Sequence, residues 1–369
     1  MYRKPKKEKP LNTLKSELRV ADTILSELGF SLDEYQPHIS GERSLMGAIT
    51  TKSGKKLILL GKRKSDAKRV VIKISADTEG KQEIQQERIA REALKNIIFS
   101  YKVFFSPEEI LFKKVGKYSI SIQEYINQKC TFLERPLEEQ FSLALRAFKA
   151  QESAHSVTYG HKKATGRTFA YVNSSWYIES YEKFKENICR KLPENKKLHL
   201  LLQKGFEILT QSKERIEQYC NFLTHTDFVP HNFRVIENNI YLLDHSSLRF
   251  GNKYECWARF LNFMTLHNRP LEEACLFYIK NNRTKEEYQS LQLMRIYRLG
   301  EIIWYYTNLL EKTSGDLHTL TNLRIDFWTS VLEATLKKER VDEKIVNEYK
   351  NKRDSLRSDE EKERQKIIH

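Results

Sequence analysis

The sequence predicts an α+β protein built of two lobes. Residues 45–74 contain three short aliphatic runs separated by turn residues, which is typical of strands. From about residue 131 onward, the apolar residues recur at helical spacing instead. With 369 residues, the chain is long enough to form two hydrophobic cores. The change in pattern predicts a small lobe with a mixed sheet, followed by a large and mainly helical lobe.

The predicted small lobe covers residues 11–126. It begins with a helix over residues 11–28, where leucines and isoleucines recur at helical spacing and Gly29 follows as a stop. A second helix is expected over residues 78–98, with Asp77 or Thr78 as its N-cap. The strands of the sheet are expected at residues 45–51, 57–60, 70–74, 104–112 and 117–126.

The predicted large lobe covers residues 127–336. Its helices are expected at residues 137–155, 175–192, 198–222, 271–281, 285–310 and 316–336. A hairpin interrupts them, with two short strands joined by the turn Glu237-Asn238-Asn239. Outside the two lobes, the lysine-rich residues 1–10 predict a disordered basic arm. The strongly charged residues 337–369 predict a solvated helix that frays to disorder.

Composition limits the class of partner. The chain has 64 Lys and Arg against 49 Asp and Glu, a net charge of +15. Its densest basic stretches, residues 3–9 and 62–69, lack the interleaved aromatic residues that stack on bases, so there is no strong case for a nucleic-acid partner. No apolar run approaches the ~18 residues of a membrane span. Five scattered cysteines without a Cys-x-x-Cys pair indicate reduced thiols in a cytoplasmic protein.

One loop and the hairpin after it contain the residue types that phosphoryl transfer needs. Asp227 and Asn232 lie on a loop that includes Pro230, and Asp244 ends the second strand of the hairpin. One carboxylate can orient and deprotonate an attacking hydroxyl, while an amide and a second carboxylate can hold the Mg²⁺ that neutralises the phosphates. A chance surface cluster is the less favoured interpretation, because the spacing, the proline turn and the hairpin occur together.

This stretch resembles the catalytic and metal-binding loops of the aminoglycoside phosphotransferase and choline kinase family. That family has His-Gly-Asp-x-x-x-x-Asn, then a hairpin, then Ile-Asp-Phe or Ile-Asp-Trp. The resemblance covers roughly residues 41–260 and implies a bilobal protein-kinase-like fold that uses ATP and Mg²⁺. It also implies that Asp227 is the catalytic base, that His225 braces the loop, and that Asn232 and Asp244 are the metal ligands.

The same resemblance implies a phosphate clamp in the small lobe. Lys73 is the lysine of the apolar strand at residues 70–74, and such a strand lysine grips the α- and β-phosphates. It would pair with a glutamate of the following helix. Glu87 is the favoured partner, since it shares a helix face with apolar residues, while Glu92 is the next choice and Glu83 the third.

Two further nucleotide contacts follow from the resemblance. The backbone of Glu124 and Ile126, at the end of the last strand, would hydrogen-bond the adenine, as the hinge of such enzymes does. The segment that covers the phosphates would contain either Gly54, which is better spaced relative to the strand lysine, or Gly41, which is closer to the family's Ser-Gly segment.

We therefore expect an ATP-dependent phosphotransferase that phosphorylates a hydroxyl of a small molecule. Aminoglycosides are polycations and this chain is strongly basic, so a neutral or anionic acceptor is expected instead. Two alternatives remain open. One is a nucleotide-binding pseudokinase scaffold, which Thr226 at the family's glycine position and His245 after Asp244 allow. The other is a kinase acting on a protein or on a membrane-associated sugar.

Overall fold

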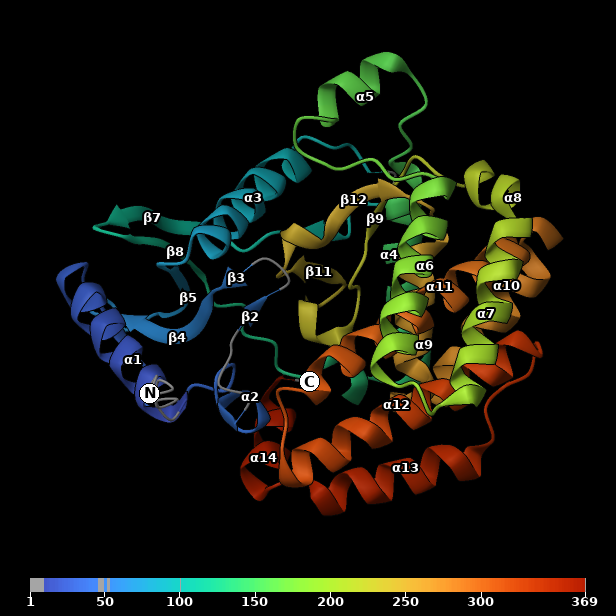
Figure 1. Ribbon diagram of the computed structural model, residues 1–369. Coiled ribbons are helices and arrows are strands. Elements are labelled where there is room, and N and C mark those ends of the chain that lie inside the picture. Colours follow the sequence, from blue (N-terminus) through green and yellow to red (C-terminus); the bar gives the residue numbers. More distant parts are fainter. Residues whose placement is uncertain (1–9, 46–49, 52–53, 100, 369) are drawn as a thin grey trace, which may run out of the picture. The chain divides into compact units, whose positions relative to one another are not determined.

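A computed structural model describes residues 10–45, 50–51, 54–99 and 101–368 of the chain (Figure 1). The chain divides into two compact units. The first unit consists of Met1–Ile89, Ser106–Asn127 and Ser358–His369, and the second of Ala90–Phe105 and Gln128–Arg357. No helix among the described residues is long and apolar enough to cross a bilayer.

The first unit is built on a five-stranded antiparallel sheet with the strand order β1-β4-β5-β8-β7. Its strands are β1 (Phe30–Leu32), β4 (Leu57–Arg63), β5 (Arg69–Ser75), β7 (Glu109–Val115) and β8 (Tyr118–Glu124). Helix α1 (Pro10–Glu27) packs its apolar side on this sheet, where Leu25 joins the core formed by Leu59, Ile72 and Ile122. Helix α3 (Thr78–Lys95) follows β5.

Within the strand predicted at residues 45–51, the prediction is wrong at Leu45 and confirmed at Thr50–Thr51. Glu42–Leu45 forms a short helix, α2, and Thr50–Thr51 (β2) pairs only with Gly54–Lys55 (β3). A helix starts here because Gly41 adopts a positive φ of 59° and the backbone N–H of Glu42 donates to the Glu361 carboxylate at 3.0 Å. Residues 46–49 lie outside the described part, as do residues 1–9 of the predicted basic arm.

The charged C-terminal segment is helical, as predicted, but it is partly buried, so the prediction that it is solvated is wrong for that part. It forms α13 (Glu343–Leu356) and α14 (Asp359–Ile368). Val346 and Tyr349 of α13 are buried, and the Tyr349 ring stacks on Phe327 with 4.4 Å between centroids. Two apolar residues three positions apart are enough to anchor one face of a helix whose other faces remain charged.

The second unit is mainly helical, with α11 (Lys285–Leu310) packed against several of its neighbours (Figure 1). The other helices are α4 (Leu137–Ser153), α5 (Tyr159–Thr165), α6 (Ser174–Lys191), α7 (Lys196–Gln211), α8 (Lys213–Gln218), α9 (Tyr254–His267), α10 (Arg269–Asn282) and α12 (Gly315–Leu336). Tyr181 explains two helical glycines. A Cβ on Gly205 would lie 2.3 Å from the Tyr181 hydroxyl, and a Cβ on Gly300 would lie 2.4 Å from the Tyr181 ring. The glycines make room for this fully buried side chain.

Short strands of the second unit carry the motif residues. β9 (Phe222–His225) pairs with β12 (Leu248–Gly251), and neither strand was expected from the sequence. β10 (Phe233–Ile236) and β11 (Asn239–Leu242) form the predicted hairpin. β11 also pairs in parallel with β6 (Phe104–Phe105). The single strand predicted at residues 104–112 is thus two strands, β6 and the start of β7.

Candidate active site

The loop between β9 and β10 is anchored by buried aromatic residues. Phe228 and Phe233 stack with 4.9 Å between ring centroids, and both are almost fully buried. Pro230 opens a short 3₁₀ turn that ends at Asn232. The N–H of Leu243 then donates to the Asn232 carbonyl at 2.9 Å, which places Asn232 beside the residue that precedes Asp244. The apolar anchor and the hairpin together bring the motif residues to one place.

His225 joins the two halves of the motif. Its Nε2 lies 2.6 Å from the carbonyl oxygen of Asp244, and its backbone N–H donates to Gln151 at 2.8 Å. Burial lowers the pKa of this imidazole below its usual value, although the nearby Asp244 and Asp227 act in the opposite direction. A neutral imidazole facing a carbonyl must carry its proton on Nε2, so His225 donates to Asp244 and braces the loop.

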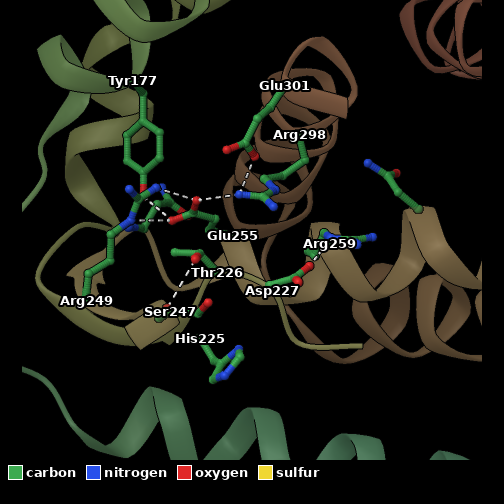
Figure 2. Close-up of polar contacts among 12 residues, drawn as sticks. Tyr177, His225, Thr226, Asp227, Ser247, Arg249, Glu255, Arg259, Arg298 and Glu301 are labelled. Carbon is green, nitrogen blue, oxygen red and sulfur yellow. Dashed lines mark hydrogen bonds and ion pairs between the residues drawn. The ribbon is translucent and has the colours of Figure 1, made fainter. Parts of the chain in front are cut away.

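Asp227 is bonded on both oxygens. Arg259 of α9 donates Nε–H to Oδ1 at 2.7 Å (Figure 2). The Asn232 amide donates to Oδ2 at 2.7 Å. Burial alone would raise the pKa of Asp227, but Arg259 and then Arg298 outweigh it and lower the pKa to about 2. The side chain is still 40% exposed, so a ligand can reach this ionised carboxylate.

The Asp244 carboxylate is oriented by the two serines that follow it. Ser246 donates through its hydroxyl to Oδ1 at 2.6 Å, and Ser247 through its hydroxyl to Oδ2 at 2.9 Å. Each carboxylate oxygen has a second lone pair, so these bonds fix the group without excluding a cation. The Asn232 amide oxygen accepts no hydrogen bond within the described residues.

The side chains of Asp244 and Asn232 fit the requirements of Mg²⁺. This ion prefers hard oxygen ligands and is usually held by one or two protein groups plus phosphates and water. The described residues contain no cluster of three or more His, Cys, Asp or Glu side chains that could hold a metal ion by itself. The Asp244 carboxylate and the Asn232 amide oxygen are thus the groups that would hold Mg²⁺ together with a phosphorylated ligand.

Thr226, which stands at the family's glycine position, needs no special backbone conformation. It is not among the described non-glycine residues with positive φ. Its N–H and its hydroxyl both donate to the carbonyl of Ser247, at 2.8 and 3.1 Å. A side chain at this position therefore adds a contact between the loop and the segment after Asp244.

A network of arginines and glutamates lies on the helical side of the loop (Figure 2). Glu255 is fully buried and accepts hydrogen bonds from Arg249 at 2.5 Å, from Tyr177 at 2.7 Å and from Arg298 at 3.3 Å. Arg298 also pairs with Glu301 at 2.5 Å. The sequence analysis missed Arg259 and Arg298 because their helices differ little in pattern from ordinary amphipathic ones.

The first unit contains the ion pair that the sequence predicts. Lys73 of β5 and Glu87 of α3 are both buried and form a salt bridge. Glu92, the second choice, is more than half exposed and pairs with Lys95 instead. Lys56, which the sequence analysis overlooked, is 4% exposed and lies 2.6 Å from Glu83 and 3.5 Å from Glu87. Two buried lysines thus share two glutamates.

The predicted hinge lies at the end of β8. Glu124 is exposed, and its N–H donates to the Glu108 carbonyl at 2.9 Å. Ile126 has a buried side chain, and its N–H makes no hydrogen bond within the described residues, which leaves it available to a ligand. The role of these residues in binding adenine stays a prediction.

The two candidate glycines differ in their surroundings. Gly54 opens β3, after a turn whose residues 52–53 lie outside the described part. Gly41 lies against α14, where its N–H donates to Glu360 at 3.3 Å and a Cβ would meet Glu361 at 2.2 Å. Because a carboxylate already contacts the backbone at Gly41, Gly54 is the better candidate for the segment that covers the phosphates.

Comparison with solved structures identifies the fold. A thermostable mutant of aminoglycoside phosphotransferase APH(4)-Ia, in a ternary complex with AMP-PNP and hygromycin B, matches with a TM-score of 0.56 and 10% sequence identity over 78% of this chain and 91% of that chain. The chain has the fold of the aminoglycoside phosphotransferases. APH(4)-Ia itself matches with a TM-score of 0.54 and 11% identity over 88% of this chain and 98% of that chain.

A further structure of this phosphotransferase, in a complex with ADP and hygromycin B, matches with a TM-score of 0.52 and 11% identity over 78% of this chain and 92% of that chain. No protein-family model matches the sequence. No curated protein matches it either. The predicted protein-kinase-like fold, a sheet followed by a mostly helical region, is confirmed, but the sheet of the first unit is antiparallel and not mixed as predicted. Identities near 10% restrict the comparison to the fold.

Proposed function

We propose that this protein is an ATP-dependent phosphotransferase that transfers the γ-phosphoryl group to a hydroxyl of a small molecule. The observation that carries the proposal is an ionised Asp227 with Asn232 on one loop, joined through His225 to Asp244 after the hairpin, in a chain with the phosphotransferase fold. The buried pair of Lys73 and Glu87 supports it, since such a pair positions nucleotide phosphates in this fold.

In the proposed reaction, the acceptor oxygen forms a bond to the γ-phosphorus while the bond to the bridging β–γ oxygen breaks and ADP leaves. The exposed edge of Asp227 accepts a hydrogen bond from the hydroxyl, orients it and takes its proton. Asn232 and Asp244 would hold Mg²⁺, which neutralises charge on the phosphates. His225 acts indirectly, by fixing the backbone of Asp244.

Two variants test the assignment of roles. Asp227→Asn keeps the shape of the side chain and removes the base, so turnover should fall by ~10²–10⁴-fold while Mg²⁺-dependent ATP binding changes little. Asp244→Asn removes a charged metal ligand and should weaken Mg²⁺-dependent ATP binding as well as the rate. Calorimetric titration of ATP with and without Mg²⁺, beside single-turnover kinetics, measures both effects. The reverse pattern would contradict the assignment.

A nucleotide-binding scaffold without turnover is the second candidate. It is favoured by the contacts that both acids already make, Asp227 with Arg259 and Asp244 with two serine hydroxyls. The two candidates differ in a simple measurement. A wild-type protein that binds Mg·ATP, yet neither hydrolyses it nor phosphorylates any hydroxyl compound, would be a scaffold.

The surroundings of Asp227 argue against a polycationic acceptor. A site for an aminoglycoside needs carboxylates that are free to face ammonium groups. Here Glu255 and Glu301 are already paired with arginines, and Asp227 is paired with Arg259. We therefore propose a neutral or anionic acceptor, although the solved relatives with this fold bind hygromycin B.

A further inference from the structure

One face of α9 extends from the candidate base. Arg259, Phe263 and His267 are spaced by four residues, so their side chains follow one another along the helix. The rings of Phe263 and His267 stack with 4.0 Å between centroids, and His231 of the loop after Asp227 packs against Phe263 at 5.4 Å. These three rings thus form a cluster one turn along α9 from Arg259, and Glu255, the carboxylate one turn before Arg259, is already paired with Arg249 and Arg298.

Arg259 uses only part of its hydrogen-bonding capacity. Its Nε–H is taken by Asp227, whereas its terminal nitrogens donate no hydrogen bond within the described residues. The side chain is 19% exposed, so a ligand can reach the guanidinium. A guanidinium held through Nε still presents its two terminal nitrogens, the edge that binds a carboxylate or a phosphate through paired hydrogen bonds.

Charge balance shows which ligands this arrangement favours. Asp227, Glu255 and Glu301 interact with Arg249, Arg259 and Arg298, so three acids face three arginines (Figure 2). A cationic ligand would have to compete with Arg259 for Asp227. An anion can bind Arg259 from the other side without breaking an existing pair. The network therefore disfavours a cationic ligand near Asp227, whereas an anionic ligand can be bound by Arg259.

We propose that the acceptor is a hydroxylated compound with an anionic group, a carboxylate or a phosphate, and that Arg259 binds this group and so determines specificity. The inference rests on the proposed phosphotransferase function and adds the substrate class. Arg259 contacts both the base and the anion, so it places the acceptor hydroxyl within reach of Asp227. Arg259 thus has two roles. Its Nε–H holds Asp227 in place, and its terminal nitrogens select an acceptor that carries an anion.

The test uses four acceptors with one six-carbon polyol skeleton and different charges. Gluconate carries a carboxylate, glucitol 6-phosphate a phosphate, glucitol no charge and glucamine an ammonium group. Transfer from radiolabelled Mg·ATP is measured for each with the full-length protein. Since a charge-assisted hydrogen bond contributes about 1.5–3 kcal/mol, kcat/KM for the better anionic acceptor should exceed that for glucitol and glucamine by ~10-fold or more. The two anionic acceptors distinguish a carboxylate from a phosphate.

Variants of Arg259 complete the test. Arg259→Gln should remove the preference for anions mainly by raising KM, and Arg259→Lys should retain part of it. Arg215→Gln is the matched control, because Arg215 lies on α8 and, among the described residues, bonds only Gln218 of the same helix. Its charge preference should equal that of the wild type.

The outcomes separate the inference from the function on which it rests. A wild-type protein that does not bind Mg·ATP in calorimetry would refute the phosphotransferase function. A protein that binds Mg·ATP but prefers neither anionic acceptor would refute the inference alone. The same holds for a protein that binds Mg·ATP and phosphorylates none of the four compounds. Equal preference in the wild type and in Arg259→Gln would refute the role of Arg259.

Discussion

The protonation of Asp227 depends on a balance between burial and two arginines. Burial opposes ionisation of this carboxylate, and Arg259 followed by Arg298 favours it. The pKa of about 2 lies below the value of roughly 3.9 for an unfolded Asp, so the favourable interaction is fully present above about pH 4 and is lost as the pH falls toward 2. Asp227 is therefore fully ionised at any pH at which a kinase would be assayed.

Replacing Arg259 should shift this equilibrium. In Arg259→Gln, the strongest favourable charge is gone while burial remains, so the pKa of Asp227 should rise above about 2 toward its usual value. Carbon-13 NMR titration of the carboxyl groups measures this shift, and Asp227→Asn identifies the resonance. An unchanged pKa in Arg259→Gln would show that Arg298 alone holds the carboxylate ionised.

His225 makes stability depend on pH in the neighbourhood of pH 6. Burial lowers its pKa below the value of roughly 6.5 expected in the unfolded chain, so the unfolded state binds the proton more readily. Its contribution to the free energy of unfolding is complete above about pH 6.5 and declines as the pH falls below that value. Urea unfolding at pH 7.5 and 5.5 should show a smaller decline for His225→Gln than for the wild type. Equal declines would mean that other groups cause the pH dependence.

At the scale of elements, α3 is joined to the sheet of the first unit by a shared charge cluster. Lys73 pairs with Glu87, and Lys56 pairs with Glu83 and lies near Glu87. Three of these four side chains are at least 94% buried. Removing one partner of a buried pair leaves the other uncompensated, which typically costs ~3–5 kcal/mol.

The two lysines should differ in their consequences. Lys56→Met leaves Glu83 without its cation and should destabilise the protein by about 3 kcal/mol in urea unfolding. Lys73→Met leaves Lys56 near Glu87, so its cost in stability should be smaller, while Mg·ATP affinity should fall because the proposed phosphate clamp is lost. Calorimetry and unfolding on both variants distinguish these effects. Normal ATP affinity in Lys73→Met would contradict the clamp.

At the scale of the whole molecule, the last helix completes the first unit. Glu361 of α14 accepts the N–H of Glu42 at 3.0 Å and pairs with Arg364 at 2.6 Å, and both side chains are buried. Of these two partners, Glu42 is 319 positions earlier in the chain. A segment that composition describes as a solvated tail is thus part of the folded unit.

A double-mutant cycle tests this contact. Gly41→Ala should destabilise the full chain for two reasons: a positive φ of 59°, which costs a residue with a Cβ roughly 1–2 kcal/mol, and a clash with Glu361. In the background of Glu361→Ala, only the backbone strain remains, so the same substitution should cost less. Strict additivity of the two free-energy changes, measured by urea unfolding, would show that Glu361 does not pack against Gly41.

Local patterns in the sequence were sufficient to predict the fold class and most of the longer helices and strands, but not β9 and β12. The short spacings around a hairpin indicated that Asp227, Asn232 and Asp244 lie close together. The resemblance to the phosphotransferases implied the pairing of Lys73 with a glutamate of the next helix, Glu87 being the favoured one. The sequence alone also excluded a membrane-spanning helix of ordinary length, in agreement with the described residues.

Only the tertiary structure determined the rest. Arg259 is 32 positions from Asp227, Lys56 is 27 positions from Glu83, and Glu361 is 319 positions from Glu42. Such contacts depend on how separate elements pack, and a charged residue on an amphipathic helix has the same sequence pattern whether it faces water or a buried partner. The residue types needed for phosphoryl transfer could therefore be predicted locally. The charges that surround the candidate base, and with them the proposed choice of acceptor, arise only when distant helices come together.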